Sequence, residues 1–262
     1  MSTLKDMIKN NMGTEELIIQ QKLNSLFYLP AKPKLETEMI IAQATQDKVR
    51  TGLHLSAITS TSDKDFCYRE QVLSLFYKMA QGENIDIGLK RIFEQGNFIG
   101  EKWQRLFLRG GLGGVKDMDR SRFHPLYDLS FTPDAIITIG KKQYVVEIKS
   151  QNTFIYGKSK GHSSGEKQCR MYMWLSGIHD GFVLVDNKND QNFKTIMLKH
   201  DEDLILPYIE RLEAIQEYKQ RFIEEKKPPK RICDKSTCKR AKSCNMKDAC
   251  WNIGMGRVKL KK

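Results

Sequence analysis

The stretch 133–150, which reads PDAIITIGKKQYVVEIKS, constrains the fold of this chain more than any other. An apolar run at 135–139 and a second at 144–148 flank a Gly-Lys-Lys turn, which is typical of a β-hairpin. Side chains alternate between the two faces of a strand. Glu147 and Lys149 are therefore predicted to share one face, with Val146 and Ile148 on the other face, toward a core. The hairpin would also bring Asp134 beside Glu147.

Two carboxylates and an ammonium at the rim of an apolar sheet suit the hydrolysis of a phosphodiester. Carboxylate oxygens bind Mg²⁺ or Mn²⁺, and the bound metal acidifies water and polarises a phosphate. The ammonium of Lys149 can orient that water or stabilise developing charge. On its own, Glu-x-Lys on a strand is more often a surface ion pair. The preceding Pro-Asp across a clear turn favours the catalytic interpretation.

Pro133-Asp134 followed by Glu147-Ile148-Lys149 resembles the motif of the PD-(D/E)XK nuclease superfamily. The resemblance implies a restriction-endonuclease-like core with catalytic Asp134, Glu147 and Lys149, of which the two acids bind the metal. It extends over roughly residues 53–252.

Gln168 and Tyr172 lie four residues apart on a helix expected at about 164–176, so they share a face. Following the Glu-x-Lys by about twenty residues, they resemble a pair found in the RecB-type branch. In that branch the pair lies beside the catalytic carboxylates and helps to hold DNA. His162 and Lys188 are further candidates for phosphate contacts, although an isolated His or Lys in a loop is more often simply solvated.

The helix before the hairpin departs from the family pattern. The family carries a histidine in a Gly-x-x-x-His-Glu sequence, whereas here Gly100 occupies the histidine position. Glu101, one residue further, is a candidate metal ligand in its place. Consecutive side chains diverge by about 100° around a helix, so the alternative is a surface carboxylate.

Six cysteines are present, and the last four are spaced C-x4-C-x5-C-x5-C in a segment poor in large apolar residues. Such a segment needs a crosslink or a metal to fold, and in a cytosolic chain ligation is favoured over disulfides. The many lysines and arginines nearby are expected to lower the thiol pKa values. By themselves these residues fit zinc and a [4Fe–4S] cluster equally well.

Cys67, at the start of an early helix, makes the chain resemble the iron–sulfur subgroup of RecB-type nucleases. That subgroup includes the AddB nuclease domain and CRISPR-associated four-cysteine nucleases. The resemblance implies a [4Fe–4S] cluster held by Cys67, Cys244, Cys250 and either Cys238 or Cys233, with zinc as the alternative. Cys169, inside the Gln168–Tyr172 helix, is expected to be a small core residue.

Composition is that of a globular protein, with 40% hydrophobic and 29% charged residues and no membrane-length apolar run. The charged, amphipathic start does not resemble a signal peptide, which favours the cytoplasm, or a host cytoplasm if the chain is phage-encoded. The net charge is +12, and residues 226–262 hold 13 Lys and Arg against 2 Asp and Glu. This basic tail suggests nucleic acid as a partner, or else a charged tail that maintains solubility.

Apolar spacing predicts helices at about 1–29, 38–50, 65–79, 87–108, 164–176 and 201–225, and strands at 181–186 and 193–199. The glycines at 110–114 are interpreted as a helix stop. The expected fold is α/β, with a central mixed sheet flanked by helices and a C-terminal cysteine cluster. The expected segments are 1–52 (helical), 53–227 (nuclease core) and 228–262 (cysteine-rich).

The expected function is a metal-dependent DNA nuclease, most plausibly an exonuclease on DNA ends or single strands in recombination, repair or replication. Three alternatives remain open: a DNA-binding protein of the same fold with weakened catalysis, a structure-specific endonuclease, and an interaction module with a zinc-bound tail.

Overall fold

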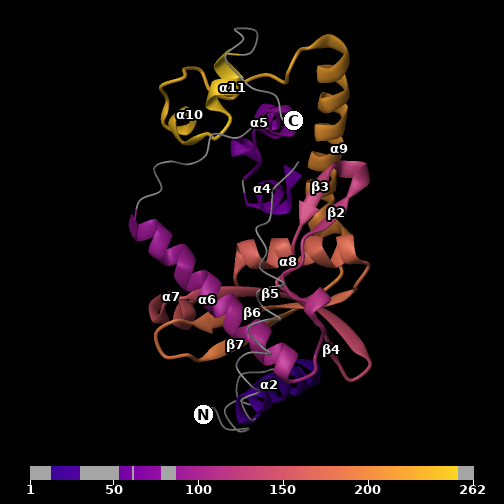
Figure 1. Ribbon diagram of the computed structural model, residues 1–262, viewed down its shortest axis with the longest axis vertical. Helices are drawn as coiled ribbons and strands as arrows, with labels where there is room; N and C mark the ends of the chain where they lie inside the picture. Colours follow the sequence, from indigo (N-terminus) through magenta and orange to yellow (C-terminus); the bar gives the residue numbers. More distant parts are fainter. Residues whose placement is uncertain (1–12, 30–52, 61, 78–86, 253–262) are drawn as a thin grey trace. The chain divides into compact units, whose positions relative to one another are not determined.

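A computed structural model describes residues 13–29, 53–60, 62–77 and 87–252 (Figure 1). The helix expected at 38–50 lies outside these residues. The chain divides into two compact units, one formed by 1–48, 91–121 and 132–201, and the other by 49–90, 122–131 and 202–262. This division differs from the three consecutive segments expected from the sequence. No helix within the described ranges has the length and apolarity needed to cross a membrane.

The first unit contains a four-stranded mixed sheet in the order β4-β5-β6-β7. Its strands are β4 (Ala135–Ile139), β5 (Lys142–Gln151), β6 (Asp180–Asn187) and β7 (Phe193–Lys199). β4 and β5 are antiparallel, β5 and β6 parallel, and β6 and β7 antiparallel. The central strands read as continuous apolar runs, which is typical of strands covered on both faces.

Helices cover both faces of this sheet (Figure 1). They are α2 (Thr14–Ser25), α6 (Ile87–Arg109, whose first four residues belong to the other unit), α7 (Thr153–Lys158) and α8 (Ser163–Ser176). Short 3-10 turns occupy Leu26–Tyr28 and Val115–Asp117. α2 and α6 pack a core of large apolar side chains against one face, and α8 contacts β5 and β6. α8 ends at Gly177, whose φ of 65° suits a residue without a Cβ.

The second unit combines helices with a small sheet in the order β1-β3-β2. The strands are β1 (Leu53–His54), β2 (Arg122–His124) and β3 (Leu129–Phe131). The helices are α4 (Leu55–Thr59), α5 (Tyr68–Phe76), α9 (Glu202–Glu225), α10 (Lys239–Ser243) and α11 (Lys247–Asn252), with 3-10 turns at Asp63–Asp65 and Pro125–Tyr127. α5 packs against both α9 and α11.

The expected α/β class, the mixed sheet and the strands at 135–139 and 193–199 are confirmed. The hairpin begins at Ala135, and the preceding strand β3 belongs to the small sheet of the second unit. Pro133 lies between these two strands and has no N–H for a ladder, so the chain is interrupted there. Between β5 and α8 the chain forms the short helix α7, which was not predicted from the sequence.

Candidate active site

The β4–β5 hairpin places Asp134 alongside Glu147. Ala135 pairs with Val146 in the antiparallel register, so Asp134, which precedes Ala135, adjoins Glu147, which follows Val146. Asp134 Oδ2 accepts a hydrogen bond of 2.7 Å from the backbone N–H of Ile148. The backbone carbonyl of Asp134 accepts from Gln104 Nε2 of α6 at 3.0 Å. Both ends of Asp134 are thus fixed at the start of β4.

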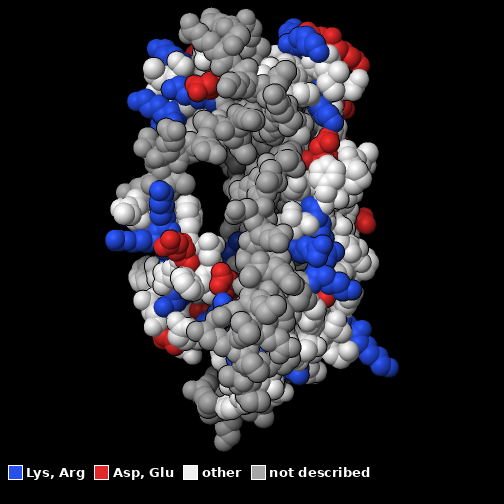
Figure 2. Space-filling view, in the orientation of Figure 1, with Lys and Arg blue, Asp and Glu red and all other residues white. Residues whose placement is uncertain are grey.

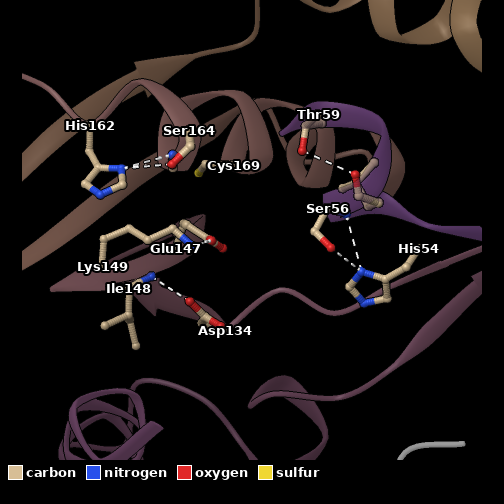
Figure 3. Close-up of polar contacts among 12 residues, drawn as sticks. His54, Ser56, Thr59, Asp134, Glu147, Ile148, Lys149, His162, Ser164 and Cys169 are labelled. Carbon is tan, nitrogen blue, oxygen red and sulfur yellow. Dashed lines mark hydrogen bonds and ion pairs between the residues drawn. The ribbon is translucent and has the colours of Figure 1, made fainter. Parts of the chain in front are cut away.

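Glu147 and Lys149 share a face of β5, as the alternation predicts. Lys149 Nζ lies 2.5 Å from Glu147 Oε1, and Figure 3 shows the lysine chain extending toward that carboxylate. Val146 and Ile148 belong to the core on the opposite face. Glu147 is only 2% exposed, and its Oε2 has no hydrogen-bond partner among the described residues.

Burial is the main cause that raises the pKa of Glu147, to about 8, and the nearby charge of Asp134 raises it further. The ammonium of Lys149 opposes that shift without cancelling it. Burial alone would lower the pKa of Lys149, but the charges of Glu147 and Asp134 outweigh burial and raise it. Lys149 is therefore an ammonium at neutral pH.

This pair of carboxylates fits a divalent cation. A buried carboxylate oxygen without a donor, next to a second carboxylate, is an environment that a cation would stabilise. No three His, Cys, Asp or Glu side chains within the described ranges come together as a metal site. Asp134 and Glu147 would therefore supply two carboxylate ligands, and other oxygen atoms would complete the coordination shell of the cation.

Glu101, the expected third ligand, is not brought together with Asp134 and Glu147. It lies on α6, where its carboxylate is 3.6 Å from Arg105 one turn further along. Gly100 shares a helix face with Gln104, which does reach Asp134. Glu101, the next residue, is offset by about 100° around the helix and so does not point along the direction of Gln104.

α8 lies over the face of the sheet that carries Glu147. Tyr172 is buried, and the pKa of its hydroxyl is raised well above the usual value by burial and by the charges of Glu147 and Asp134. Gln168, one turn earlier, is half-buried. Tyr172 thus lies near the two carboxylates, while the expected contact of both residues with DNA stays a prediction. Cys169 is fully buried, consistent with the expected core residue.

His162 caps the start of α8 through Nδ1, which accepts from the N–H of Gly165 at 3.2 Å. Burial and the charge of Lys149 lower its pKa, so the neutral ring predominates at neutral pH. Lys188 follows β6, and its N–H donates to the carbonyl of Gln151 at 3.0 Å. Their expected contacts with phosphate stay predictions.

In the second unit five cysteines lie at the start of α5 and between residues 233 and 250, although no three of them come together as a metal site within the described ranges. All are free thiols, and Cys67, Cys233, Cys244 and Cys250 line one cavity. Cys238 caps α10 by accepting from the N–H of Ala241 at 3.3 Å, and it also forms a hydrogen bond with Cys233. Lysine and arginine side chains gather on the surface over α10 (Figure 2).

The expected lowering of the thiol pKa values is wrong for three cysteines. Burial is the main cause that raises the pKa of Cys67, of Cys233 to about 11 and of Cys244 to about 12, and the charge of Glu70 adds to this at Cys67 and Cys244. The charge of Arg240 lowers the pKa of Cys67 and Cys233 but does not outweigh burial. Only Cys238 has a lowered pKa, mainly because of the N–H of Ala241.

Arg69 is a functional candidate whose role the sequence did not reveal. Its side chain is 8% exposed. Nε donates to Cys250 Sγ at 3.2 Å, Nη2 to the carbonyl of Cys250 at 3.1 Å, and Nη1 to the carbonyl of Pro229 at 2.8 Å. No carboxylate within the described ranges pairs with it. A buried charge needs a counter-charge, so this guanidinium fits an anionic sulfur.

Comparisons with known proteins give distant structural matches only. No protein-family model and no curated protein matches the sequence. Among solved structures, LHK-Exo in complex with dAMP is similar at a TM-score of 0.48 and 16% identity over 66% of this chain and 90% of that one. An alkaline exonuclease (LHK-Exo) from Laribacter hongkongensis gives a TM-score of 0.47 and 17% identity over 66% of this chain and 90% of that one. SSO0001 gives a TM-score of 0.41 and 14% identity over 78% of this chain and 89% of that one.

Proposed function

We propose that the chain is a divalent-metal-dependent DNA nuclease of the PD-(D/E)XK type. The observation that carries the proposal is the buried carboxylate of Glu147 beside the half-buried Asp134 on the adjoining strand, with Lys149 in contact with Glu147. A buried carboxylate next to a second carboxylate is costly for stability. A cation and an anionic phosphate would offset that cost.

Asp134 and Glu147 would hold Mg²⁺ or Mn²⁺, which when bound supplies a more acidic water and a polarised phosphate. Lys149 stays charged and stabilises negative charge that grows on the phosphate oxygens. Gln104 and the N–H of Ile148 hold Asp134 in place. Gln168 and Tyr172 on α8 would contact the bound strand.

Incubation of the purified protein with Mn²⁺ and end-labelled DNA tests the proposal. Cleavage should be lost in Glu147→Ala and retained in Glu94→Ala, which changes an exposed glutamate of α6. Closed circular single-stranded DNA separates the finer alternatives, because an exonuclease leaves it intact and a structure-specific endonuclease does not require an end. Cleavage that survives in Glu147→Ala would contradict the proposal.

A second candidate function is DNA binding without turnover. It is favoured by one observation, that only two carboxylates gather at the site and Glu101 does not join them. DNA binding that is unchanged in Glu147→Ala, together with no cleavage in any divalent metal, would support this candidate over the first.

The cysteines of the second unit would hold a [4Fe–4S] cluster, with zinc as the alternative. The support is the shared cavity and the buried guanidinium of Arg69 directed at Cys250 Sγ. Cys67, Cys244 and Cys250 are the proposed ligands, with Cys233 or Cys238 as the fourth. Metal and sulfide analysis of anaerobically purified protein tests this, since zinc brings no acid-labile sulfide and no visible colour.

A further inference from the structure

The carboxyl ends of β5 and β6 hold two buried amide groups that the proposed catalytic residues do not explain. Gln151 and Asn187 are the last residues of these parallel strands and are paired in register. They are 8% and 1% exposed. Within the described ranges, Gln151 Oε1 and Asn187 Nδ2 have no hydrogen-bond partner. Such atoms are rare in native proteins and call for a ligand or another explanation.

Both amides lie on the sheet face that carries Glu147. A Cβ placed on Gly165 of α8 would lie 3.1 Å from the side chains of Lys149 and Val183, so these two face α8. Gln151 follows Lys149 by two residues and Asn187 follows Val183 by four, which keeps both on the same face. At about 3.3 Å per residue, Gln151 lies about 13 Å along the strand from Glu147. A bound DNA strand readily spans this distance.

The neighbouring contacts fix which atom of Asn187 is the free donor. Its Oδ1 accepts from the backbone N–H of Asn189 and from Thr153 Oγ1, each at 3.2 Å. A backbone N–H can only donate, so the oxygen must occupy that position and Nδ2 carries the unused N–H groups. Paired strands lie about 4.8 Å apart. The residues that carry this donor and this acceptor are thus neighbours on adjoining strands.

The next element, α7, follows β5 at the same end of the sheet (Figure 1), and its sequence includes Phe154 and Lys158. Phe154 is 69% exposed, and the ammonium of Lys158 lies 3.7 Å from the centre of its ring. Thr153, which holds Asn187, directly precedes this ring. Exposed aromatic rings with neighbouring cations are the features that bind single-stranded nucleic acid by stacking and phosphate contact.

We propose that the ends of β5 and β6 together with α7 form a subsite for one nucleotide of a single DNA strand whose phosphodiester lies at Asp134 and Glu147. Asn187 Nδ2 donates to this nucleotide, and Gln151 Oε1 accepts from it. Phe154 stacks on a base, and Lys158 lies near the backbone phosphate. A base edge or a sugar hydroxyl offers the required donor and acceptor. This inference rests on the proposed function and deepens it.

Binding of a short fluorescein-labelled oligothymidylate, measured by anisotropy in EDTA, tests the subsite without cleavage. Asn187→Asp is nearly isosteric and keeps the oxygen that accepts from Asn189, but it removes the donor, so Kd should rise about tenfold. Phe154→Ala should raise Kd roughly 5- to 150-fold. The matched control is Asn189→Asp, which adds the same charge two residues away while keeping its bond to Thr153, and should change Kd about twofold or less.

The chemistry of the contact is separated by two modified oligonucleotides. With abasic sites in place of bases, loss of the Asn187→Asp effect assigns the contact to a base edge. Loss of the effect only with a dideoxy end assigns it to a sugar hydroxyl. Either result supports the subsite, and a thermal melt of each variant verifies that it is folded.

The failures of the subsite and of the nuclease proposal are distinguishable. Cleavage that depends on Glu147, together with equal Kd values for wild type, Asn187→Asp and Phe154→Ala, overturns the subsite alone. Absence of cleavage, with weakened binding in both variants, overturns the nuclease proposal and supports the subsite. Equal weakening by Asn187→Asp and Asn189→Asp, with no effect of Phe154→Ala, reduces the effect to charge repulsion and overturns the subsite.

Discussion

Replacement of Arg69 by methionine provides a quantitative test of whether Cys250 is an anionic sulfur ligand. Arg69 donates one hydrogen bond to each of the carbonyls of Pro229 and Cys250, and a third to Cys250 Sγ. A hydrogen bond to a charged group, here the guanidinium, contributes about 1.5–3 kcal/mol net. The third bond is expected at the upper end of this range only if the sulfur is also charged.

With metal or cluster bound, Arg69→Met should therefore lower the free energy of unfolding by about 6 kcal/mol, from two bonds of about 1.5 kcal/mol to carbonyls and one of about 3 kcal/mol to a charged sulfur. After treatment with a chelator, Cys250 Sγ no longer ligates a metal and the cost should fall to about 4.5 kcal/mol. For a chain of this size each kcal/mol shifts Tm by roughly 2–4 °C. Calorimetry of the loaded and stripped proteins measures both losses.

Arg231→Met is the matched control. Arg231 Nη2 donates to the same carbonyl of Cys250 at 2.8 Å, but its side chain is exposed. An exposed bond of this kind is expected to change stability by about 0.5 kcal/mol or less. If Arg69→Met costs as much in the stripped protein as in the loaded protein, Cys250 is not an anionic ligand and the reasoning is refuted.

Two further predictions concern the first unit. A Cβ at Gly100 meets no atom within 4 Å, and Gln104 on the same helix face reaches Asp134. Gly100→His should therefore lower the Mn²⁺ concentration at which thermal stabilisation is half-maximal, compared with Gly100→Ala. Equal Mn²⁺ responses of the two variants would contradict this prediction. Hydrogen bonds from Lys142 and Lys199 lower the pKa of Glu15 from 4.5 to about 2, so wild type should exceed Glu15→Gln in stability by up to ~1 kcal/mol above pH 4.5. That advantage should shrink as the pH falls and vanish below about 2, as measured by urea unfolding, and an advantage that grows toward low pH would reverse the assigned sign.

The hairpin and its face assignments could be predicted from the sequence because their determinants are local. Apolar runs on either side of Gly140, whose φ is 65°, specify the turn and the register. Once the register is fixed, the two-residue period decides that Glu147 and Lys149 share a face. The four-residue spacing of Gln168 and Tyr172 similarly predicted a common helix face, and the electrostatic influence of Glu147 on Tyr172 agrees with its expected position.

Features that depend on contacts distant in sequence were beyond this reasoning. The residues from α9 to the cysteines group with 49–90 and 122–131 in one compact unit, although α9 begins 112 positions after the first of these segments ends and 71 positions after the second. The pKa values of the thiols depend on burial, which composition does not reveal, so counting lysines gave the wrong direction. Gln104 carried no motif, and its contact with the carbonyl of Asp134 arises only from how α6 packs.

The same electrostatic reasoning applies to the candidate sites of both units. Glu147 is a buried acid with one oxygen that lacks a donor, and Asp134 beside it makes ionisation less favourable still. Arg69 is a buried base whose partners are two carbonyls and a sulfur. Uncompensated buried charges are destabilising, and a bound ion of the opposite sign removes the penalty. Burial and charge are therefore the common basis of the two proposals, in which the acidic site would bind a cation and Arg69 would face an anionic sulfur centre.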